Sequence, residues 1–222
     1  MLGQAFIPLA LTLKVASIAT LLALLSGGLC GFLLARHRFP GRELVDAVCT
    51  LPLVMPPTVL GYYLIVLIGR RGWIGGWLWD TFGINLMFTW QGAVFASAIV
   101  AFPLVFKSAR AAFEGVDTQL ENAARTLGVT EFGVFVRITL PLAWRGILAG
   151  SMLAFARAMG EFGATLMVAG NIPGKTQTLS LAVYDAVQAG QDDLANFLVL
   201  LTSFVVVAIL MGSGRLLTPA HA

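Results

Sequence analysis

Charged residues are scarce in this chain. Only 11% of its 222 residues are Asp, Glu, Lys or Arg, whereas soluble domains carry about 25%. Apolar residues make up 58% of the chain, and the mean hydropathy is +0.87. A fold in water has no means of hiding so much apolar surface. Lipid is therefore the expected solvent, and a soluble globular protein is excluded.

Residues that bind metals or act as nucleophiles are equally scarce. Cys30 and Cys49 lie inside apolar runs without CxxC or Cys/His spacing, which indicates packing residues and neither a disulfide nor a metal site. His37 and His221 are isolated beside basic or terminal sequence, so neither predicts a metal ligand or a catalytic dyad. We therefore expect no catalytic residue, no metal site and no cofactor bound by this chain, which argues against a membrane-embedded enzyme.

A nucleotide-binding motif is also missing. Gly174-Lys175-Thr176 resembles the end of a P-loop, but that pattern needs Gly five residues before Gly174, and position 169 is Ala. We expect residues 171–177 to form a turn in an outer loop, and any energy from ATP to enter through another polypeptide. The net charge of +3 predicts cationic residues on the cytoplasmic side and no nucleic-acid partner.

Five apolar stretches reach the roughly 20 residues that a helix needs to cross a bilayer. The first lacks a basic n-region and is too long for a signal peptide, so we expect it to be retained as a membrane helix. With no internal repeat and no soluble segment, the sequence predicts one all-α transmembrane domain over residues 1–222. The spans are expected at about residues 9–35, 45–68, 86–106, 146–169 and 194–212.

Basic residues in the connections predict the orientation. Nine Lys or Arg residues follow odd-numbered spans, and three lie on the opposite side. By the positive-inside rule, the N-terminus lies outside and the C-terminus in the cytoplasm. Four tryptophans gather in the outer loop after span two, where residues 72–82 are expected as a short interfacial helix. The nine are Arg36, Arg38, Arg42, Lys107, Arg110, Arg125, Arg137, Arg145 and Arg215, the three are Arg70, Arg71 and Lys175, and the tryptophans are Trp73, Trp77, Trp79 and Trp90.

The long inner loop, residues 107–145, has the pattern of a short helix. Thr118 and Glu121 have the spacing of a capping box, and Gly128 stands where a left-handed C-cap is wanted. Pro141 marks the entry into span four. Two interpretations follow: a surface helix that completes the loop, or a docking helix for a cytosolic partner with Glu121 and Arg125 as its polar contacts.

This loop resembles the cytoplasmic loop of permease subunits in binding-protein-dependent ABC importers. The family pattern is E-A-A, three residues, G, nine residues and I-x-L-P. The spacing matches throughout, with one departure: Asn122 occupies the place of the usual Glu, and Glu121 precedes it. The matching residues are Ala123, Ala124, Gly128, Ile138, Leu140 and Pro141.

The resemblance implies that the loop holds a coupling helix, which fits a groove on a separate ATPase. The segments LPLVMPPTVLGYYL (51–64) and AFARAMGEFGATLMVAGNIPGKTQTLSLAVY (154–184) resemble molybdate permeases; sulfate and tungstate permeases are similar but usually diverge there. The implied assembly is a permease homodimer with two cytoplasmic ABC ATPases, which use ATP and Mg, and a periplasmic oxyanion-binding protein that docks near residues 171–177. The implied coupling residues are Glu121, Asn122, Ala123, Ala124, Arg125, Gly128, Ile138, Leu140 and Pro141.

The expected function is therefore that of a permease subunit, which translocates molybdate across the cell inner membrane by alternating access. A sulfate/thiosulfate or tungstate ABC permease is an alternative, because tetrahedral dianions of similar shape are not distinguished by these residues. An ion-coupled secondary transporter is a further alternative, against which the lack of an internal repeat argues.

Two features inside the spans are candidates for the translocation pathway. Arg157 and Glu161 lie one turn apart in span four, either as an ion pair that locks the helices or as a positive field for an anion. Pro56 and Pro57, together with Pro52, interrupt span two and either line the pathway or serve packing.

Overall fold

The computed structural model describes residues 2–217, with side chains over 3–212, and each regular element in that range is a helix. The predicted all-α membrane fold is confirmed. His221 and the side chain of Arg215 lie outside the described part. The elements are α1 (Leu2–Arg36), α2 (Arg42–Val54), α3 (Pro57–Ile68), α4 (Trp73–Phe82), α5 (Trp90–Glu114), α6 (Thr118–Thr126), α7 (Glu131–Val134), the π-helix η1 (Phe135–Thr139), α8 (Leu140–Met159), α9 (Gly163–Ala169), α10 (Leu179–Gln188) and α11 (Asp192–Leu217).

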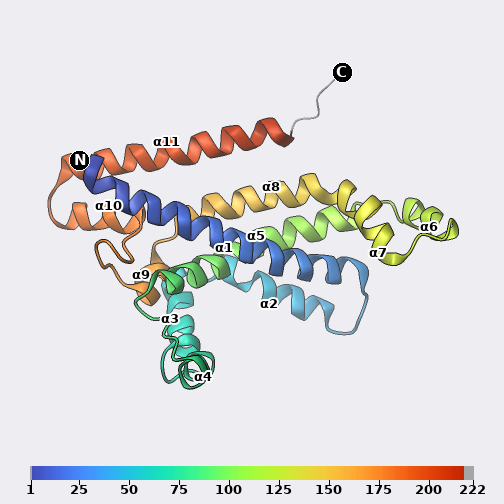
Figure 1. The fold of residues 1–222 in the computed structure, drawn as a ribbon, viewed down its shortest axis with the longest axis horizontal. Helices are drawn as coiled ribbons and strands as arrows, with labels where there is room; N and C mark the ends of the chain where they lie inside the picture. Colours follow the sequence, from blue (N-terminus) through green and yellow to red (C-terminus); the bar gives the residue numbers. More distant parts are fainter. Residues whose placement is uncertain (1, 218–222) are drawn as a thin grey trace.

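Within residues 2–217, four helical segments are long and apolar enough to span a membrane, and the bent pair α2–α3 makes a fifth. Helices α6 and α7 lie at one end of the molecule, opposite the N-terminus and α10 (Figure 1). The third expected span begins at Trp90, where the Thr89 side chain caps the helix, and continues to Glu114. The fourth expected span ends at Met159, before the separate short helix α9.

The second expected span is an elbow. The helix axis bends by 115° between α2 and α3, and Pro56 and Pro57 explain the bend. A proline has no N–H to donate to the carbonyl four residues earlier, so the carbonyl oxygens of Pro52 and Leu53 lose their helical donors. The chain leaves the helix at Met55, which is extended with ψ 141°.

Ion pairs hold the N-terminal part of α2 against α5. Lys107 donates to Asp46 at 2.6 Å, and Arg110 also pairs with Asp46. Arg42 donates to Glu114 at 2.6 Å. These three pairs join the N-terminal part of α2 to the C-terminal half of α5, whereas no residue of α2 is buried in the described chain.

Glycines allow α1 and α5 to approach closely. A Cβ atom at Gly31 would lie 2.9 Å from the backbone nitrogen of Arg110, and one at Gly27 would lie 3.1 Å from that of Phe106. In lipid, where apolar contact with solvent is not penalised, such close backbone packing is a main source of helix association. The α1–α5 contact is therefore fixed by backbone shape.

A cation–π contact at the level of Lys14 joins α1 to the start of α5. The Lys14 ammonium lies 3.5 Å from the centroid of the Trp90 ring at the start of α5. From Lys14 to Arg36 the helix rises about 33 Å, close to the hydrocarbon thickness of about 30 Å. The first turns of α1 extend past this level, where Ala5 packs against α10 and α11 and Thr12 accepts a hydrogen bond from Leu179 N at 2.8 Å.

The expected interfacial segment is a helix, α4, whose ends are set by glycines. Gly72 precedes it in an extended conformation, and Gly83 ends it with φ 65°. In contrast, α10 was not predicted, because residues 179–188 are too short to register as a span.

Candidate coupling and translocation sites

Helix α6 forms where the inner loop predicts a helix, but its cap differs. The side chain of Asp117 accepts from Gln119 N at 2.8 Å and is the N-cap. The predicted capping box with Thr118 is therefore wrong by one residue, and Glu121 does not return to the helix start. Gly128 has φ +82°, as the predicted left-handed C-cap requires.

One face of the helix is open to solution. Asn122, Ala123 and Arg125 are exposed, whereas Ala124 is buried. Arg125 donates to both carboxylate oxygens of Glu131 at 2.7 and 3.0 Å, and this contact raises the pKa of the Arg125 guanidinium. The basic group is thus held in a fixed position on the loop surface.

Two large apolar side chains complete this surface. Leu127 is 84% exposed and Phe132 is 77% exposed, both next to the end of α6. Sequence reasoning missed them, because single apolar residues in a loop have no periodic pattern. Their signal is position: they flank Gly128, inside the stretch that the coupling motif covers. An apolar pair exposed at this end of the molecule indicates contact with a partner.

Glu121 points into the chain. It is 3% exposed and accepts hydrogen bonds from Arg36 of α1 and from the Thr139 hydroxyl of η1. It therefore lacks the exposed surface that a direct polar contact with a cytosolic partner would need. Of the two expected polar contacts of the docking helix, the structure places Arg125 on the exposed face.

The second half of the motif lies on η1 and the start of α8. Ile138 is half-buried, whereas Leu140 and Pro141 are exposed. Pro141 is the second residue of α8, but α7, η1 and α8 follow one another without a break, and the helical segment long enough to span a membrane runs over Glu131–Met159. Pro141 therefore lies within this segment, ten residues after its start, and its predicted place at the entry into span four stays a prediction.

Arg157 and Glu161 form the ion pair that their spacing predicts. Arg157 Nη1 donates to Glu161 Oε2 at 2.7 Å, and Glu161 Oε1 accepts from Ala164 N at 2.8 Å, at the start of α9. The side chain of Glu161 is 1% exposed, and that of Arg157 is 34% exposed. The pair therefore fixes the α8–α9 turn, while the arginine keeps a surface open.

The elbow of span two meets this turn. A Cβ atom at Gly163 would lie 2.9 Å from Cβ of Pro57, and one at Gly61 would lie 2.7 Å from Cβ of Met167. Helices α3 and α9 are thus in close contact, and Pro56 is exposed beside them. Arg157, Glu161 and Pro57, which lie in two different expected spans, belong to one connected region.

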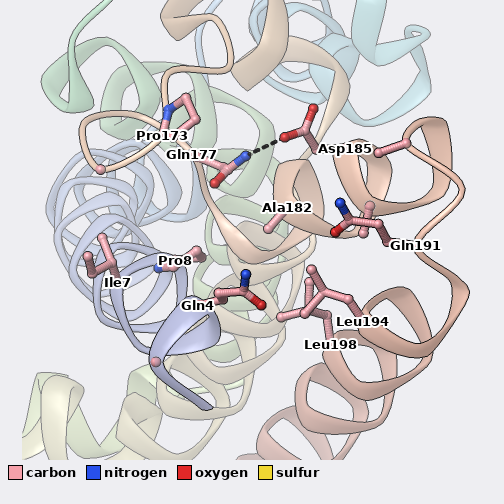
Figure 2. Close-up of a pocket in the computed structure, with 14 residues that line it drawn as sticks. Gln4, Ile7, Pro8, Pro173, Gln177, Ala182, Asp185, Gln191, Leu194 and Leu198 are labelled. Carbon is pink, nitrogen blue, oxygen red and sulfur yellow. Dashed lines mark hydrogen bonds between the residues drawn. The ribbon is translucent and has the colours of Figure 1, made fainter. Parts of the chain in front are cut away.

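The end of the molecule opposite α6 carries a cavity of about 300 Å³, which lies between α1, α10, α11 and the turn at residues 173–177. Figure 2 shows Gln4 and Gln191 around it, and Gln177 donating to Asp185 at 3.1 Å. Thr176 is buried and accepts from Ile172 N at 3.0 Å. Gly174-Lys175-Thr176 is therefore part of a tight turn.

The comparisons with known proteins agree with this arrangement. The profile of the family "Binding-protein-dependent transport system inner membrane component" matches residues 27–220. The chain belongs to this family.

Relatives of this inner membrane component include permease proteins of molybdenum and of sulfate transport systems. "Molybdenum transport system permease protein ModB" of Escherichia coli (strain K12) is 48% identical over 203 residues, which cover 90% of this chain and 89% of that protein. ModB of Haemophilus influenzae is 49% identical over 178 residues, 80% of this chain and 78% of that one. "Sulfate transport system permease protein CysW" of Synechocystis sp. is 43% identical and covers 70% of this chain and 56% of that one.

Solved structures of ABC transporters share the fold of this inner membrane component. An inward-facing MetNI methionine transporter chain matches with a TM-score of 0.75 at 18% identity, over 98% of this chain and 96% of that one. A chain of a bacterial alginate transporter, solved with its periplasmic protein, matches at 0.76 and 16% identity, over 96% and 77%. At these identities the likeness shows the fold alone.

Proposed function

We propose that the chain is the membrane-spanning permease subunit of an ATP-driven molybdate importer. The observation that carries the proposal is the 48% identity to a molybdenum permease over nine-tenths of both chains. The 43% identity to a sulfate permease, over a smaller share of that protein, makes sulfate the second candidate. Tungstate, of the same charge and shape as molybdate, stays an alternative substrate.

The proposed assembly contains two copies of this permease, two cytoplasmic ABC ATPases and a periplasmic oxyanion-binding protein. ATP and Mg belong to the ATPase, and this chain is proposed to bind no cofactor. The exposed face of α6 and its neighbours supports a coupling role. The proposed coupling residues remain Glu121, Asn122, Ala123, Ala124, Arg125, Gly128, Ile138, Leu140 and Pro141. We add Leu127 and Phe132 to the proposal because both are exposed beside α6.

The proposed orientation places the N-terminus outside and the C-terminus in the cytoplasm. Its support is the excess of Lys and Arg after odd-numbered spans. Helix α6 lies at the end of the molecule away from the N-terminus (Figure 1). The turn at residues 171–177 would then face the binding protein, and α6 would face the ATPase.

Transport is proposed to proceed by alternating access. ATP binding draws the two ATPases together, and α6 of each permease follows. The membrane helices then change from the inward-facing to the outward-facing arrangement, and the transport cavity between them receives the anion. Partners bias this equilibrium only through different affinities for the two states. Arg157, Glu161, Pro56 and Pro57 are proposed to border the pathway, because they meet where α8, α9 and α3 converge.

Uptake by the reconstituted importer tests the function. We expect vesicles that contain the permease, its ATPase and the binding protein to accumulate molybdate only when ATP is present on the side of the membrane where the ATPase is bound. Equimolar sulfate should reduce molybdate uptake weakly, and tungstate should reduce it strongly. Accumulation without any ATPase would contradict the proposal in favour of an ion-coupled transporter, and preferred uptake of sulfate would move the assignment to the second candidate.

The exposed apolar pair predicts how the ATPase is held. We expect Phe132→Ala to weaken co-purification of the ATPase at least tenfold, since a phenylalanine buried in an interface contributes about 2 kcal/mol. Phe82→Ala is the matched control: Phe82 is also exposed, at 60%, but lies on α4. Equal retention of the ATPase by both variants would remove Phe132 from the proposed interface.

A further inference from the structure

Glu121 of α6 has a buried carboxylate that contacts both α1 and η1. We infer that it is a positioning residue that locks α6 to α1 and to η1, so that a displacement of α6 moves both together. The inference rests on the proposed function, because it assigns to Glu121 the transfer of movement from a cytosolic ATPase into the membrane helices.

The polar contacts join segments that are distant in sequence. Arg36, the last residue of α1, donates to Glu121 Oε1, and so does the hydroxyl of Thr139, the last residue of η1. Arg36 is 85 positions from Glu121 in the chain, and Thr139 is 18 positions away. One carboxylate oxygen therefore connects the cytoplasm-directed end of α1 with the entry into α8.

Apart from the contact of Arg125 with Glu131 of α7, few side chains attach α6 to the rest of the chain. Of its nine residues, all described by the structure, the buried ones are Glu121 and Ala124. Its exposed residues are polar apart from Leu120 and Ala123, and the helix is too short to be stable by itself. The Glu121 carboxylate is thus the polar side-chain link from α6 to α1 and to η1.

An aromatic cluster one turn away makes the same connection. Phe32 of α1 lies 5.0 Å from the ring centroid of Phe135 in η1 and 5.2 Å from that of Phe113 in α5. Phe32 and Arg36 are one turn apart in α1, as Phe135 and Thr139 are in η1. Helices α1 and η1 are thus joined at an apolar level and at a polar level, and Glu121 supplies the polar one.

The surrounding charges favour this single arrangement. Arg125 approaches the second carboxylate oxygen of Glu121 only to 4.0 Å, and its guanidinium is engaged by Glu131. A carboxylate removed from water is stabilised only while its cationic and hydrogen-bond partners stay in place. Movement of α6 away from Arg36 or Thr139 is therefore penalised, which is what a rigid connection requires.

The test measures coupling in the complete importer. We expect Glu121→Gln, which keeps an acceptor for Thr139 but removes the charge that Arg36 neutralises, to retain the ATPase on co-purification. Molybdate transported per ATP hydrolysed should fall by about tenfold, the size of a typical coupling between sites. Arg36→Gln should have the same effect from the α1 side, and the double variant should be no worse than either single one.

Two further variants sharpen the result. Thr139→Val should reduce coupling and Thr139→Ser should restore it, because serine keeps the hydroxyl. Glu43→Gln is the matched control, since Glu43 is an exposed carboxylate at the start of α2 with no ion pair in the described chain.

Each outcome decides the inference. Normal transport per ATP in Glu121→Gln and Arg36→Gln would overturn it, and so would loss of ATPase binding in Glu121→Gln, which would make the residue part of the docking surface. If Glu121→Gln fails to accumulate in the membrane, Arg36→Gln and Thr139→Val decide by the same measure. A wild-type complex that transports no oxyanion with ATP would instead refute the proposed function.

Discussion

Gly31→Leu is expected to prevent stable accumulation of the protein in the membrane. The new side chain would begin 2.9 Å from the backbone nitrogen of Arg110 and 3.0 Å from the carbonyl oxygen of Phe106, and neither atom can move without displacing α5. Overpacking costs about 1–3 kcal/mol and occasionally more, and the upper end applies where the obstacle is backbone. The measurement is the amount of folded protein extracted in mild detergent, together with its thermal unfolding midpoint.

Gly28→Leu provides the matched control. Gly28 is in the same helix, three residues away, and a Cβ atom there meets nothing within 4 Å. Its replacement should change the free energy of unfolding by less than about 0.5 kcal/mol. Equal loss of protein in both variants would show that the contact of α1 with α5 does not explain the loss.

Arg157→Gln is the second change with a large expected effect, namely loss of both stability and oxyanion uptake. It leaves the Glu161 carboxylate, whose side chain is 1% exposed, without its cation. Leaving one member of a buried ion pair unpaired costs about 3–5 kcal/mol. Uptake in vesicles and the yield of assembled importer are the two measurements.

The double variant Arg157→Gln/Glu161→Gln separates the two roles of the pair. The amide oxygen that replaces the Glu161 carboxylate would still accept from Ala164 N at the start of α9, and no buried charge would remain. If the pair acts only as a lock, assembly and uptake should recover together. If Arg157 supplies a positive field to the anion, assembly should recover while uptake stays low. Unchanged transport and assembly in Arg157→Gln alone would exclude both roles.

The membrane helices were predictable because hydropathy and length act locally. Each expected span overlaps a described helix, although the fourth is shifted: the helical segment there runs over Glu131–Met159 and not over residues 146–169. The α6 segment with its Gly128 end followed from short-range rules. That residues 1–222 form a single transmembrane domain stays a prediction. The expected ion pair of Arg157 and Glu161 also followed from spacing within one helix.

The remaining features depend on contacts between distant parts of the chain. The burial of Glu121 depends on Arg36 and Thr139, which no spacing rule connects with it. The cap at Asp117 was missed because Thr118 next to it fits the same pattern with Glu121. The break after Met159 was missed because the apolar run continues through α9, so hydropathy does not distinguish one long helix from two.

The elbow of span two has a consequence for water. Pro56 and Pro57 leave the carbonyl oxygens of Pro52 and Leu53 without helical donors, and a bare carbonyl in hydrocarbon costs several kcal/mol. Those oxygens then need water or a donor from outside the two helices. Together with the exposed surface of Arg157, they would keep this part of the protein hydrated. A dianion that crosses the membrane with part of its hydration shell requires such a hydrated region.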